Sequence, residues 1–272
     1  MRLKVTSGRT ALNRLFPSMN PFDLTGKVAL ITGASTGFGR HFAGVLSRAG
    51  ASVGLTARRF EALEEVATDI RAAGSKAAVS KLDVRDASSV VHAVNAIEAA
   101  LGPIDILVNN AGVCITKPLL EQSESDWDDV LDINLKGAFL MSTEVARHMR
   151  THKRGGSIIN IQSILSFRQA GHITPYAASK AALNQLTKSM ALELARYSIR
   201  INGIAPGYFL TDISRDFFAS EAGNAMLKRI PQRRLGHFED LDGPLLLLAS
   251  DASRYMTGST IVVDGGHLCS NL

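Results

Sequence analysis

A tyrosine and a lysine stand four residues apart in the stretch TPYAASK. We predict that this stretch opens a helix over 175–197, with Thr174 as its N-cap and Pro175 in its first turn. Tyr176 and Lys180 are then neighbours on one face of the helix. A phenol is a poor base at neutral pH, but a nearby ammonium favours the phenolate and lowers the pKa. We therefore expect Lys180 to lower the pKa of Tyr176 and Tyr176 to transfer a proton.

Two further polar residues are placed to act with this pair. Ser163 ends the apolar run GSIINIQS, 13 residues before Tyr176, where a hydroxyl is able to donate to a substrate carbonyl. Asn134, in LDINLKGAF, lies within a predicted helix, where asparagine is mildly unfavourable. Its amide either holds a water that links Lys180 to solvent or is a satisfied polar group of the core.

The elements that must position these residues alternate regularly along the chain. Strands are predicted at 27–32, 51–57, 76–84, 104–112, 156–163, 198–207 and 259–266, and helices at 39–50, 60–74, 86–102, within 123–150 and at 175–197. Continuous apolar strands alternating with helices indicate a parallel sheet that is covered on both faces. No linker or low-complexity tract interrupts the pattern, so we predict one doubly wound α/β domain of the Rossmann type over 24–272.

Glycines separate the first predicted strand from the first helix in LITGASTGFGR, at Gly33, Gly37 and Gly39. Glycine lets the backbone turn tightly and approach a pyrophosphate, and the helix N-terminus that follows supplies N–H donors. The spacing differs from G-x-G-x-x-G, so an ordinary glycine-rich turn is the alternative. We predict a dinucleotide site here, and its further expected contacts in the turn are Ser35, Thr36 and Phe38.

The end of the second strand bears on which dinucleotide is bound. A carboxylate there would bind the ribose hydroxyls of NAD and repel a 2′-phosphate, but this chain has Arg58 and Arg59. A guanidinium holds a phosphate bidentately, so NADP(H) is favoured over NAD(H). Arg58 is the expected contact and Arg59 is expected to be a solvated charge, although both arginines could be solvated.

The ends of the third and fourth strands supply further expected cofactor contacts. Asp83 is placed to accept from the adenine amino group, with an Asx turn or a helix cap as its alternative role, and Val84 follows it. The fourth strand ends in NNAG, which contains Asn109, Ala111 and Gly112. Asparagine side chains there can bridge backbone groups across the sheet, and the small residues leave room for a flat cofactor.

Composition excludes several classes of protein. The net charge of +5 is concentrated in the first 20 residues, which carry four basic residues and no acid, so the body of the chain is nearly neutral and nucleic-acid binding is not expected. Residues 1–23 are expected to be a basic extension, and three readings stay open: a transit peptide, a surface segment, or an upstream start with Met19 as the natural one. No apolar run is long enough to span a membrane. Two cysteines favour a reducing, cytoplasmic location, and no metal-ligand cluster is apparent.

The motifs TGASTGFG, NNAG, YAASK and PG at 206–207, with Asn134, Ser163 and Thr211, resemble those of the short-chain dehydrogenase/reductase family over nearly the whole chain beyond residue 20. The resemblance implies a sheet order of 3-2-1-4-5-6-7. It also implies a catalytic tetrad, in which Tyr176 exchanges a proton with the substrate oxygen and Ser163 orients that oxygen. Asn134 and Lys180 would support the proton relay, with Lys180 also on the cofactor ribose. Contacts to the nicotinamide end would come from Pro206, Gly207 and Thr211.

The substrate is less defined. The wording ITPYAASK and ARYSIRINGIAPGYFLTDI is similar to gluconate 5-dehydrogenase-like members, and the overall pattern is also similar to 3-oxoacyl-acyl carrier protein reductases. A carbonyl reductase or alcohol dehydrogenase is therefore expected, and a non-catalytic dinucleotide sensor is the remote alternative.

A long excursion over 207–240 is expected to hold a substrate loop. It carries an apolar stripe of Tyr208, Phe209, Leu210, Ile213, Phe217, Phe218 and Met226, which either lines a pocket or packs in the core. Candidate contacts to a sugar acid are Arg215, Arg168, Gln169 and His172. Cys114 is expected to pack near the site without acting as a nucleophile. The resemblance also implies a homotetramer or homodimer.

Overall fold

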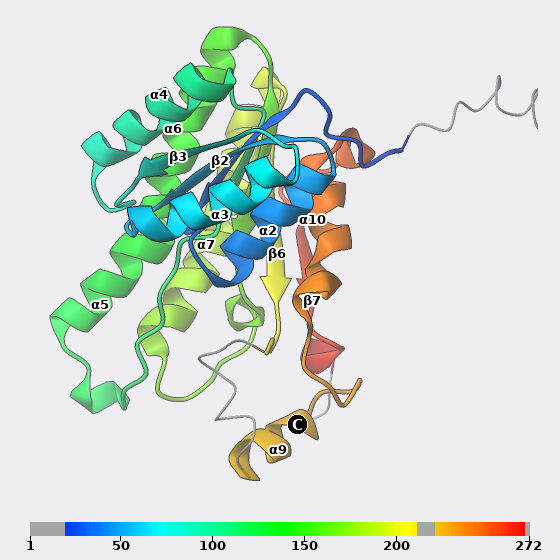
Figure 1. Cartoon of the computed structure of the whole chain (residues 1–272). Helices are drawn as coiled ribbons and strands as arrows, with labels where there is room; N and C mark the ends of the chain where they lie inside the picture. The colour runs from blue at the N-terminus through cyan, green and yellow to red at the C-terminus, as the bar shows by residue number, and fades with distance from the viewer. Residues whose placement is uncertain (1–19, 211–220, 270–272) are drawn as a thin grey trace, which may run out of the picture.

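Seven parallel strands form one sheet in the computed structural model, which describes residues 20–210 and 221–269 (Figure 1). The strands are β1 (Val28–Thr32), β2 (Ser52–Ala57), β3 (Ala77–Lys81), β4 (Ile106–Asn109), β5 (Gly156–Ile161), β6 (Ile199–Pro206) and β7 (Thr260–Val263). Their order is β3-β2-β1-β4-β5-β6-β7, and every neighbouring pair is parallel. This confirms the predicted fold class and strand order.

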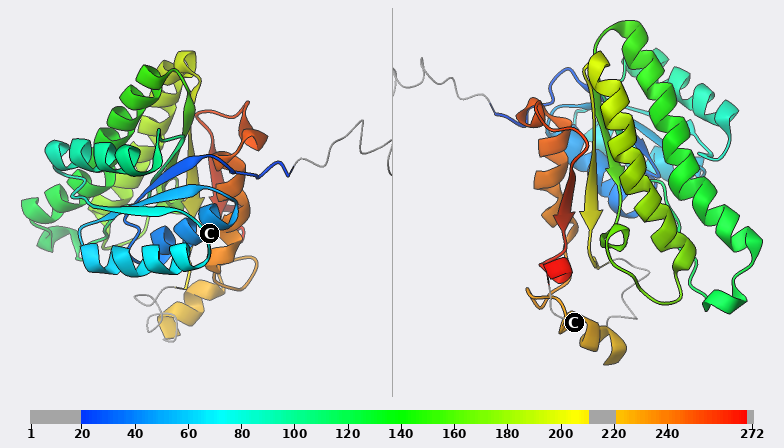
Figure 2. Two further views of the ribbon diagram at one scale, coloured as in Figure 1. Left: turned by 45° about the horizontal axis from the view of Figure 1, so that its top comes forward. Right: turned by 180° about the vertical axis from the view of Figure 1, so that it is seen from behind.

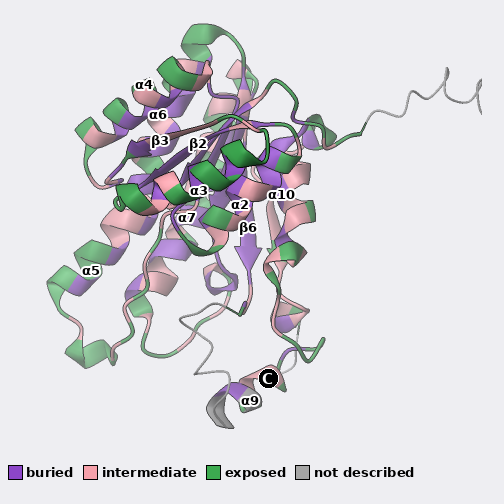
Figure 3. Cartoon of the chain, in the orientation of Figure 1, coloured by how far each residue is buried: buried purple, intermediate pink, exposed green. Residues whose placement is uncertain are grey.

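Alternate residues of the strands pack into two separate hydrophobic cores, one on each face of the sheet. In β1, Ala29 and Ile31 belong to one buried cluster, whereas Val28 and Leu30 belong to the other. Because successive side chains of a strand point to opposite faces, a strand that is apolar at every position needs a cover on both faces of its sheet. The buried strands between exposed helix surfaces are apparent in Figure 3.

The helices supply those two covers. On one face lie α2 (Gly37–Arg48), α3 (Phe60–Ala72) and α10 (Asp242–Ala249); on the other lie α4 (Ala87–Leu101), α6 (Gly137–His152) and α7 (Thr174–Leu194). The right-hand view of Figure 2 shows α6 and α7 crossing the face opposite α2 and α3. In the part of the chain that the structure describes, no helix has the length and apolar character needed to cross a bilayer.

Shorter elements complete the chain. The helix α5 (Glu124–Leu131) runs through a π-helical turn, η2 (Asp132–Lys136), directly into α6. The helix α9 is Glu221–Leu227, and the 3₁₀ turns are η1 (Leu119–Glu121), η3 (Ile164–Ser166), η4 (Ala195–Tyr197), η5 (Phe238–Leu241), η6 (Asp251–Ser253) and η7 (His267–Cys269).

Several predicted boundaries are wrong in detail; for example, β4 ends at Asn109 and β5 ends at Ile161, before Ser163. The third strand ends at Lys81, so Asp83 and Val84 belong to the loop that follows it. The helix α7 begins at Thr174, and its N-cap is Ile173 without a side-chain capping bond. Thr174 is therefore the first residue of the helix and not its N-cap, and Pro175 follows it within the first turn, where its missing N–H would have no intrahelical partner.

The described parts of the excursion over 207–240 pack partly in the core. Phe209 is buried and its ring meets that of Phe38 edge-on, with centroids 5.3 Å apart. Phe38 also contacts Phe238, at 5.0 Å between centroids. The core alternative thus holds for Phe209, whereas Leu210 is exposed. The stripe members Ile213, Phe217 and Phe218 lie outside the described residues, as do the candidate substrate contact Arg215 and the basic segment 1–19.

A buried polar network crosses the sheet beside the apolar cores. Thr187 Oγ1, on α7, accepts from Asn160 Nδ2 at 2.9 Å and from Gln162 Nε2 at 3.0 Å, and donates to Leu183 O at 2.8 Å. Asn160 in turn accepts from Asn109 Nδ2 at 2.8 Å. One hydroxyl therefore satisfies two buried amide groups at the end of β5.

Replacing that hydroxyl tests the network. We expect Thr187→Val to lower the free energy of unfolding by roughly 2–4 kcal/mol, because two buried amide N–H groups lose their acceptor while the side-chain shape is kept. Urea unfolding measures the change. Thr187→Ser is the matched control. It keeps the acceptor and removes one methyl group, so the free energy of unfolding should fall by only about 1 kcal/mol. Equal losses in the two variants would contradict this role of the hydroxyl.

Candidate active site

A cleft of about 800 Å³ runs along the carboxyl ends of the strands. Its walls come from the segments that follow β1, β2, β3, β4, β5 and β6, which is where ligands bind in open α/β sheets. The lining residues are Gly33, Ser35, Thr36, Gly37, Phe38, Ala57, Arg58, Arg59, Leu82, Asp83, Val84, Asn110, Ala111, Gly112, Val113, Cys114, Ile133, Ile161, Gln162, Ser163, Tyr176, Lys180, Pro206 and Gly207.

Most of the residues predicted for the site thus come together in this one cleft. The exceptions are Gly39, Asn109 and Asn134, which lie behind its wall, and Thr211, which is outside the described residues. Asn109 contributes to the buried network through its amide and does not line the cleft.

The glycine turn brings the backbone close to the cleft. Gly33 and Gly37 have φ angles of +66° and +55°, in the left-handed region that favours glycine. A Cβ at Gly39 would overlap Gly33 O, so only glycine allows α2 to approach the end of β1 this closely. Thr36 makes no side-chain cap bond and the first turn of α2 has no acidic residue. The uncapped N–H groups fit the phosphates of a dinucleotide.

Asn110 fixes the turn from the neighbouring strand. Its Nδ2 donates to Thr32 O at 3.0 Å and to Gly33 O at 3.2 Å. Thr32 Oγ1 accepts from the N–H groups of Asn110 and Ala111, both at 3.0 Å. The expected bridging by an asparagine of NNAG is found, but in Asn110 and not in Asn109. The sequence did not indicate which of the two adjacent asparagines would make these bonds. Alternation along the strand shows only that their side chains point to different faces.

Both arginines after β2 line the cleft. Arg59 reaches across the glycine turn, with its guanidinium 3.3 Å from Ser35 Oγ and 3.3 Å from Thr36 Oγ1. Arg58 borders the same wall near Asp83. The sequence favoured Arg58 alone, but the structure presents two cationic groups at this end of the cleft.

Asp83 is held by an arginine that the sequence did not single out. Arg85 Nη2 and Nε donate to its carboxylate at 2.8 and 3.2 Å. This hydrogen bonding holds the pKa of Asp83 below its usual range. The side chain stays on the cleft wall in ionised form, able to accept a further hydrogen bond.

Tyr176, Ser163 and Lys180 converge at the other end of the cleft. Ser163 Oγ accepts the N–H of Leu165 at 3.1 Å, and its hydroxyl lies close enough to the phenol of Tyr176 to lower the pKa of that phenol. Lys180 is buried, its Nζ donates to Ile161 O at 2.8 Å, and it lies 5.5 Å from the centre of the Tyr176 ring. The i,i+4 spacing therefore does bring the amine over the phenol.

The expected direction of the tyrosine pKa is wrong. Burial raises the pKa of Tyr176 to about 12, and the hydrogen bond from Ser163 opposes this only in part. Burial also lowers the pKa of Lys180 to about 8. Removal from water disfavours both charged forms, and the amine points to a backbone carbonyl instead of the phenol oxygen. Desolvation therefore exceeds the effect of the neighbouring ammonium.

Hydrogen bonds through Ser179 connect Asn134 to α7, the helix that carries Tyr176 and Lys180. It lies in the π-helical turn, a rare feature that is frequent at functional sites. Its Oδ1 accepts from Val113 N at 2.8 Å, and its Nδ2 donates to Val113 O at 2.9 Å and to Ser179 Oγ at 3.1 Å. Ser179 then donates to Tyr176 O at 2.7 Å. The amide thus joins the NNAG segment to the first turn of α7.

Gly112 allows this group of polar atoms to gather. A Cβ there would lie 3.3 Å from Asn134 Oδ1 and 3.7 Å from Lys180 Nζ. Cys114 lines the cleft nearby, and burial raises the pKa of its thiol. A raised pKa keeps the thiol protonated, which agrees with the expectation that Cys114 is not a nucleophile.

The candidate sugar-acid contacts lie around the entrance to α7. Arg168 Nη1 donates to His267 O at 2.6 Å, which joins the loop after η3 to the C-terminal segment. Gln169 and His172 are exposed, and His172 O accepts from Lys117 N at 2.8 Å.

Comparisons with known proteins agree with this geometry. A family model described as short chain dehydrogenase matches residues 27–222. Gluconate 5-dehydrogenase of Gluconobacter oxydans (strain 621H) is 43% identical over 246 residues, covering 90% of this chain and 96% of that protein. The 5-keto-D-gluconate 5-reductase of Escherichia coli (strain K12) is 40% identical over 248 residues, covering 91% and 97%.

A solved structure extends the likeness to three dimensions. The crystal structure of a gluconate 5-dehydrogenase from Burkholderia cenocepacia J2315 in complex with NADP and tartrate has a TM-score of 0.88 and 40% identity, over 92% of this chain and 98% of that one. The fold, the family model and these relatives agree. The chain therefore belongs to the short-chain dehydrogenase/reductase family and is an oxidoreductase enzyme of that family.

Proposed function

We propose that this protein interconverts a ketone and a secondary alcohol of a sugar acid, with NADP(H) as the hydride carrier and Tyr176 as the general acid and base. The observation that carries the proposal is that Ser163, Tyr176 and Lys180 line the same cleft as the glycine turn. A hydride can then reach the carbon of a carbonyl group while a proton reaches its oxygen.

A bound nicotinamide supplies the hydride, and the chain supplies the proton. The phenol of Tyr176 donates its proton to the carbonyl oxygen in the direction of reduction and removes it from the hydroxyl in oxidation. Its raised pKa keeps it protonated at neutral pH, which suits reduction. Ser163 orients the same oxygen, because its own oxygen already accepts from Leu165 and its proton is free to be shared.

Lys180 and Asn134 support this proton transfer. A buried amine with a pKa of about 8 is able to give up and regain a proton near neutral pH. In its charged form it also stabilises any phenolate formed at Tyr176. Asn134 acts as a positioning residue, since its amide fixes the segment at Val113 and the first turn of α7 through Ser179.

The sugar-acid class rests on the relatives named above, whose printed names refer to gluconate and 5-keto-D-gluconate. A carboxylate needs a cationic or donor-rich site, and Arg168 is the candidate we carry over from the sequence; it lies outside the cleft lining and its Nη1 donates to His267 O. A 3-oxoacyl-acyl carrier protein reductase remains the alternative. A homotetramer or homodimer is part of the proposal, and the exposed Trp127, Phe139 and Leu192 on α5, α6 and α7 support a contact there. A cytoplasmic location remains an expectation.

Replacing the phenol tests the catalytic assignment. Wild-type enzyme should oxidise NADPH in the presence of 5-keto-D-gluconate, and we expect Tyr176→Phe to lower kcat by about 10²–10⁴-fold because the hydroxyl that transfers the proton is removed. Dissociation constants for NADPH should stay within about twofold. NADPH absorbance and fluorescence titration measure the two quantities. Activity of the wild type only on 3-oxoacyl thioesters would overturn the substrate class, and unchanged turnover in Tyr176→Phe would overturn the role of the tyrosine.

The arginines after β2 test the cofactor preference. We expect wild type to bind NADPH more tightly than NADH, and Arg58→Ala or Arg59→Ala to weaken NADPH binding by about 10–100-fold, since a charge-assisted hydrogen bond to a phosphate is lost. Binding of NADH should change little. Fluorescence titration gives all the constants, and Arg48→Ala, at the exposed far end of α2, is the control. Tighter NADH binding in the wild type would show the preference to be wrong.

The buried amine should affect stability as the pH changes. The folded-state pKa of Lys180 is about 8 and its ordinary value is 10.5, so above pH 8 the unfolded chain binds a proton that the folded chain has released. Stability of wild type relative to Lys180→Met should therefore rise between pH 8 and pH 10, by on the order of 2 kcal/mol. The raised pKa of Tyr176 acts in the opposite direction, but only above pH 10.

Urea unfolding of both proteins at several pH values measures this difference. Lys188→Met replaces an exposed lysine of the same helix and should give a difference from wild type that does not vary with pH. If the Lys180→Met difference is equally flat, the amine is not desolvated in the folded chain.

A further inference from the structure

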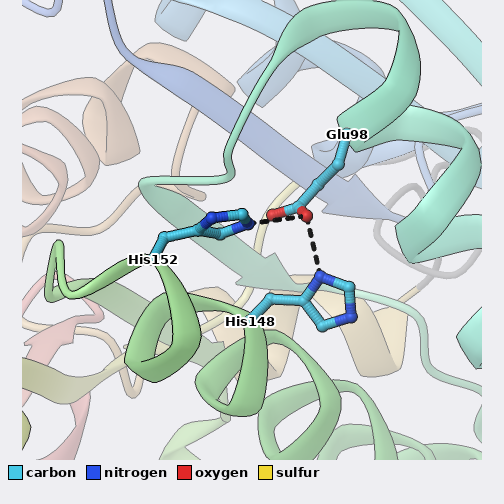
Figure 4. A group of neighbouring side chains, drawn as sticks. All are labelled: Glu98, His148 and His152. Carbon is cyan, nitrogen blue, oxygen red and sulfur yellow. Dashed lines mark hydrogen bonds and ion pairs between the residues drawn. The ribbon is translucent and has the colours of Figure 1, made fainter.

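Three potential metal ligands converge between α4 and α6, away from the cleft (Figure 4). His148 and His152 project from successive turns of α6 toward Glu98 of α4. Glu98 Oε2 lies 2.7 Å from His148 Nδ1 and 3.2 Å from His152 Nε2. One ligand atom of each residue lies within 4.8 Å of the other two.

These separations are close to those of a tetrahedral site. Bonds of about 2.0–2.1 Å from zinc to nitrogen or oxygen place two ligand atoms about 3.3 Å apart at the tetrahedral angle. Glu98 and His152, at 3.2 Å, are already near this separation, whereas Glu98 and His148, at 2.7 Å, must move apart to admit an ion. The combination of two imidazoles and one carboxylate suits Zn²⁺ and its neighbours in the first transition series.

The surroundings also resemble the outer shell of a metal site. His148 Nε2 lies 3.3 Å from Glu144 Oε1, so this nitrogen can donate its proton to a carboxylate while Nδ1 faces Glu98. Glu98 Oε1 accepts from Ile104 N at 3.1 Å, which fixes the carboxylate. Ligating histidines commonly donate their second N–H to a carboxylate in this way.

Glu144 already forms an ion pair with Arg147, at 2.9 Å, so the requirement for positive charge lies at the Glu98 carboxylate. If Nε2 of His148 carries the proton shared with Glu144, then Nδ1 has a lone pair directed at the Glu98 carboxylate 2.7 Å away. Two electron-rich atoms at this distance need a second proton or a cation between them. A metal ion meets the requirement with a neutral imidazole, and it gains the third ligand from His152.

We propose that Glu98, His148 and His152 bind one divalent transition-metal ion, with Zn²⁺ as the best match, and that Glu144 orients His148. The ion would clamp the C-terminal parts of α4 and α6. Both helices end at the amino edge of the sheet, opposite the cleft, so the site is structural and takes no part in the redox chemistry. The sequence led us to expect no metal, because the third ligand is separated from the histidine pair by about fifty positions.

Binding to the full-length protein, prepared without a histidine tag, tests the proposal. Calorimetric titration with ZnCl₂ should give one ion per chain, and Co²⁺ should give the visible absorption of a tetrahedral site. The thermal midpoint should rise by about 5 °C or more at a hundredfold excess of Zn²⁺ over its dissociation constant. Glu98→Gln, His148→Gln and His152→Gln should each remove this site, and Glu144→Gln should weaken binding by about 10–100-fold.

His92→Gln, which replaces an exposed histidine of α4, should leave the site intact. Absence of binding, or binding that survives both histidine substitutions, would overturn the proposal. The outcome does not depend on the catalytic assignment, because metal affinity and dinucleotide turnover are measured separately.

Discussion

The burial of one primary amine sets the requirements for much of this structure. Lys180 is only 4% exposed, so its Nζ needs a hydrogen-bond acceptor inside the protein, and the carbonyl of Ile161 at the end of β5 provides it. That contact fixes the distance between α7 and the sheet. The position of Tyr176, four residues earlier on the same helix, follows from where the amine is held.

The fold and most of the site follow from short-range patterns in the sequence. Apolar runs such as KVALIT are buried on both faces, and their alternation with helices permits few topologies. The glycine turn could also be predicted from the sequence. Its positive φ angles and the close approach at Gly39 favour glycine over other residues. Tyr176, Ser163 and Asn134 come together because strand ends and helix starts meet at one edge of a parallel sheet.

Features that depend on the environment of an atom were not predictable in the same way. The sequence suggested that Lys180 lowers the pKa of Tyr176, but the depth of burial decides the sign, and depth is a tertiary property. Arg58 and Arg59 are adjacent, and only the path of the chain after β2 shows that Arg59 reaches Ser35. The histidines of α6 acquire a third partner through helix packing, which no local pattern encodes.

The π-helical turn between α5 and α6 has a consequence for how this chain tolerates change. A π turn accommodates one residue more than the α-helical repeat allows, so the sequence pattern shifts by one residue across it while the helix continues. Deleting a single residue within Asp132–Lys136 would restore a regular helix and turn the Asn134 amide away from Val113. The sheet and both cores would be preserved, so such a chain would fold but lose the contacts of Asn134 with Val113. Alignments of related chains that ignore this extra residue would misplace every buried position of α6.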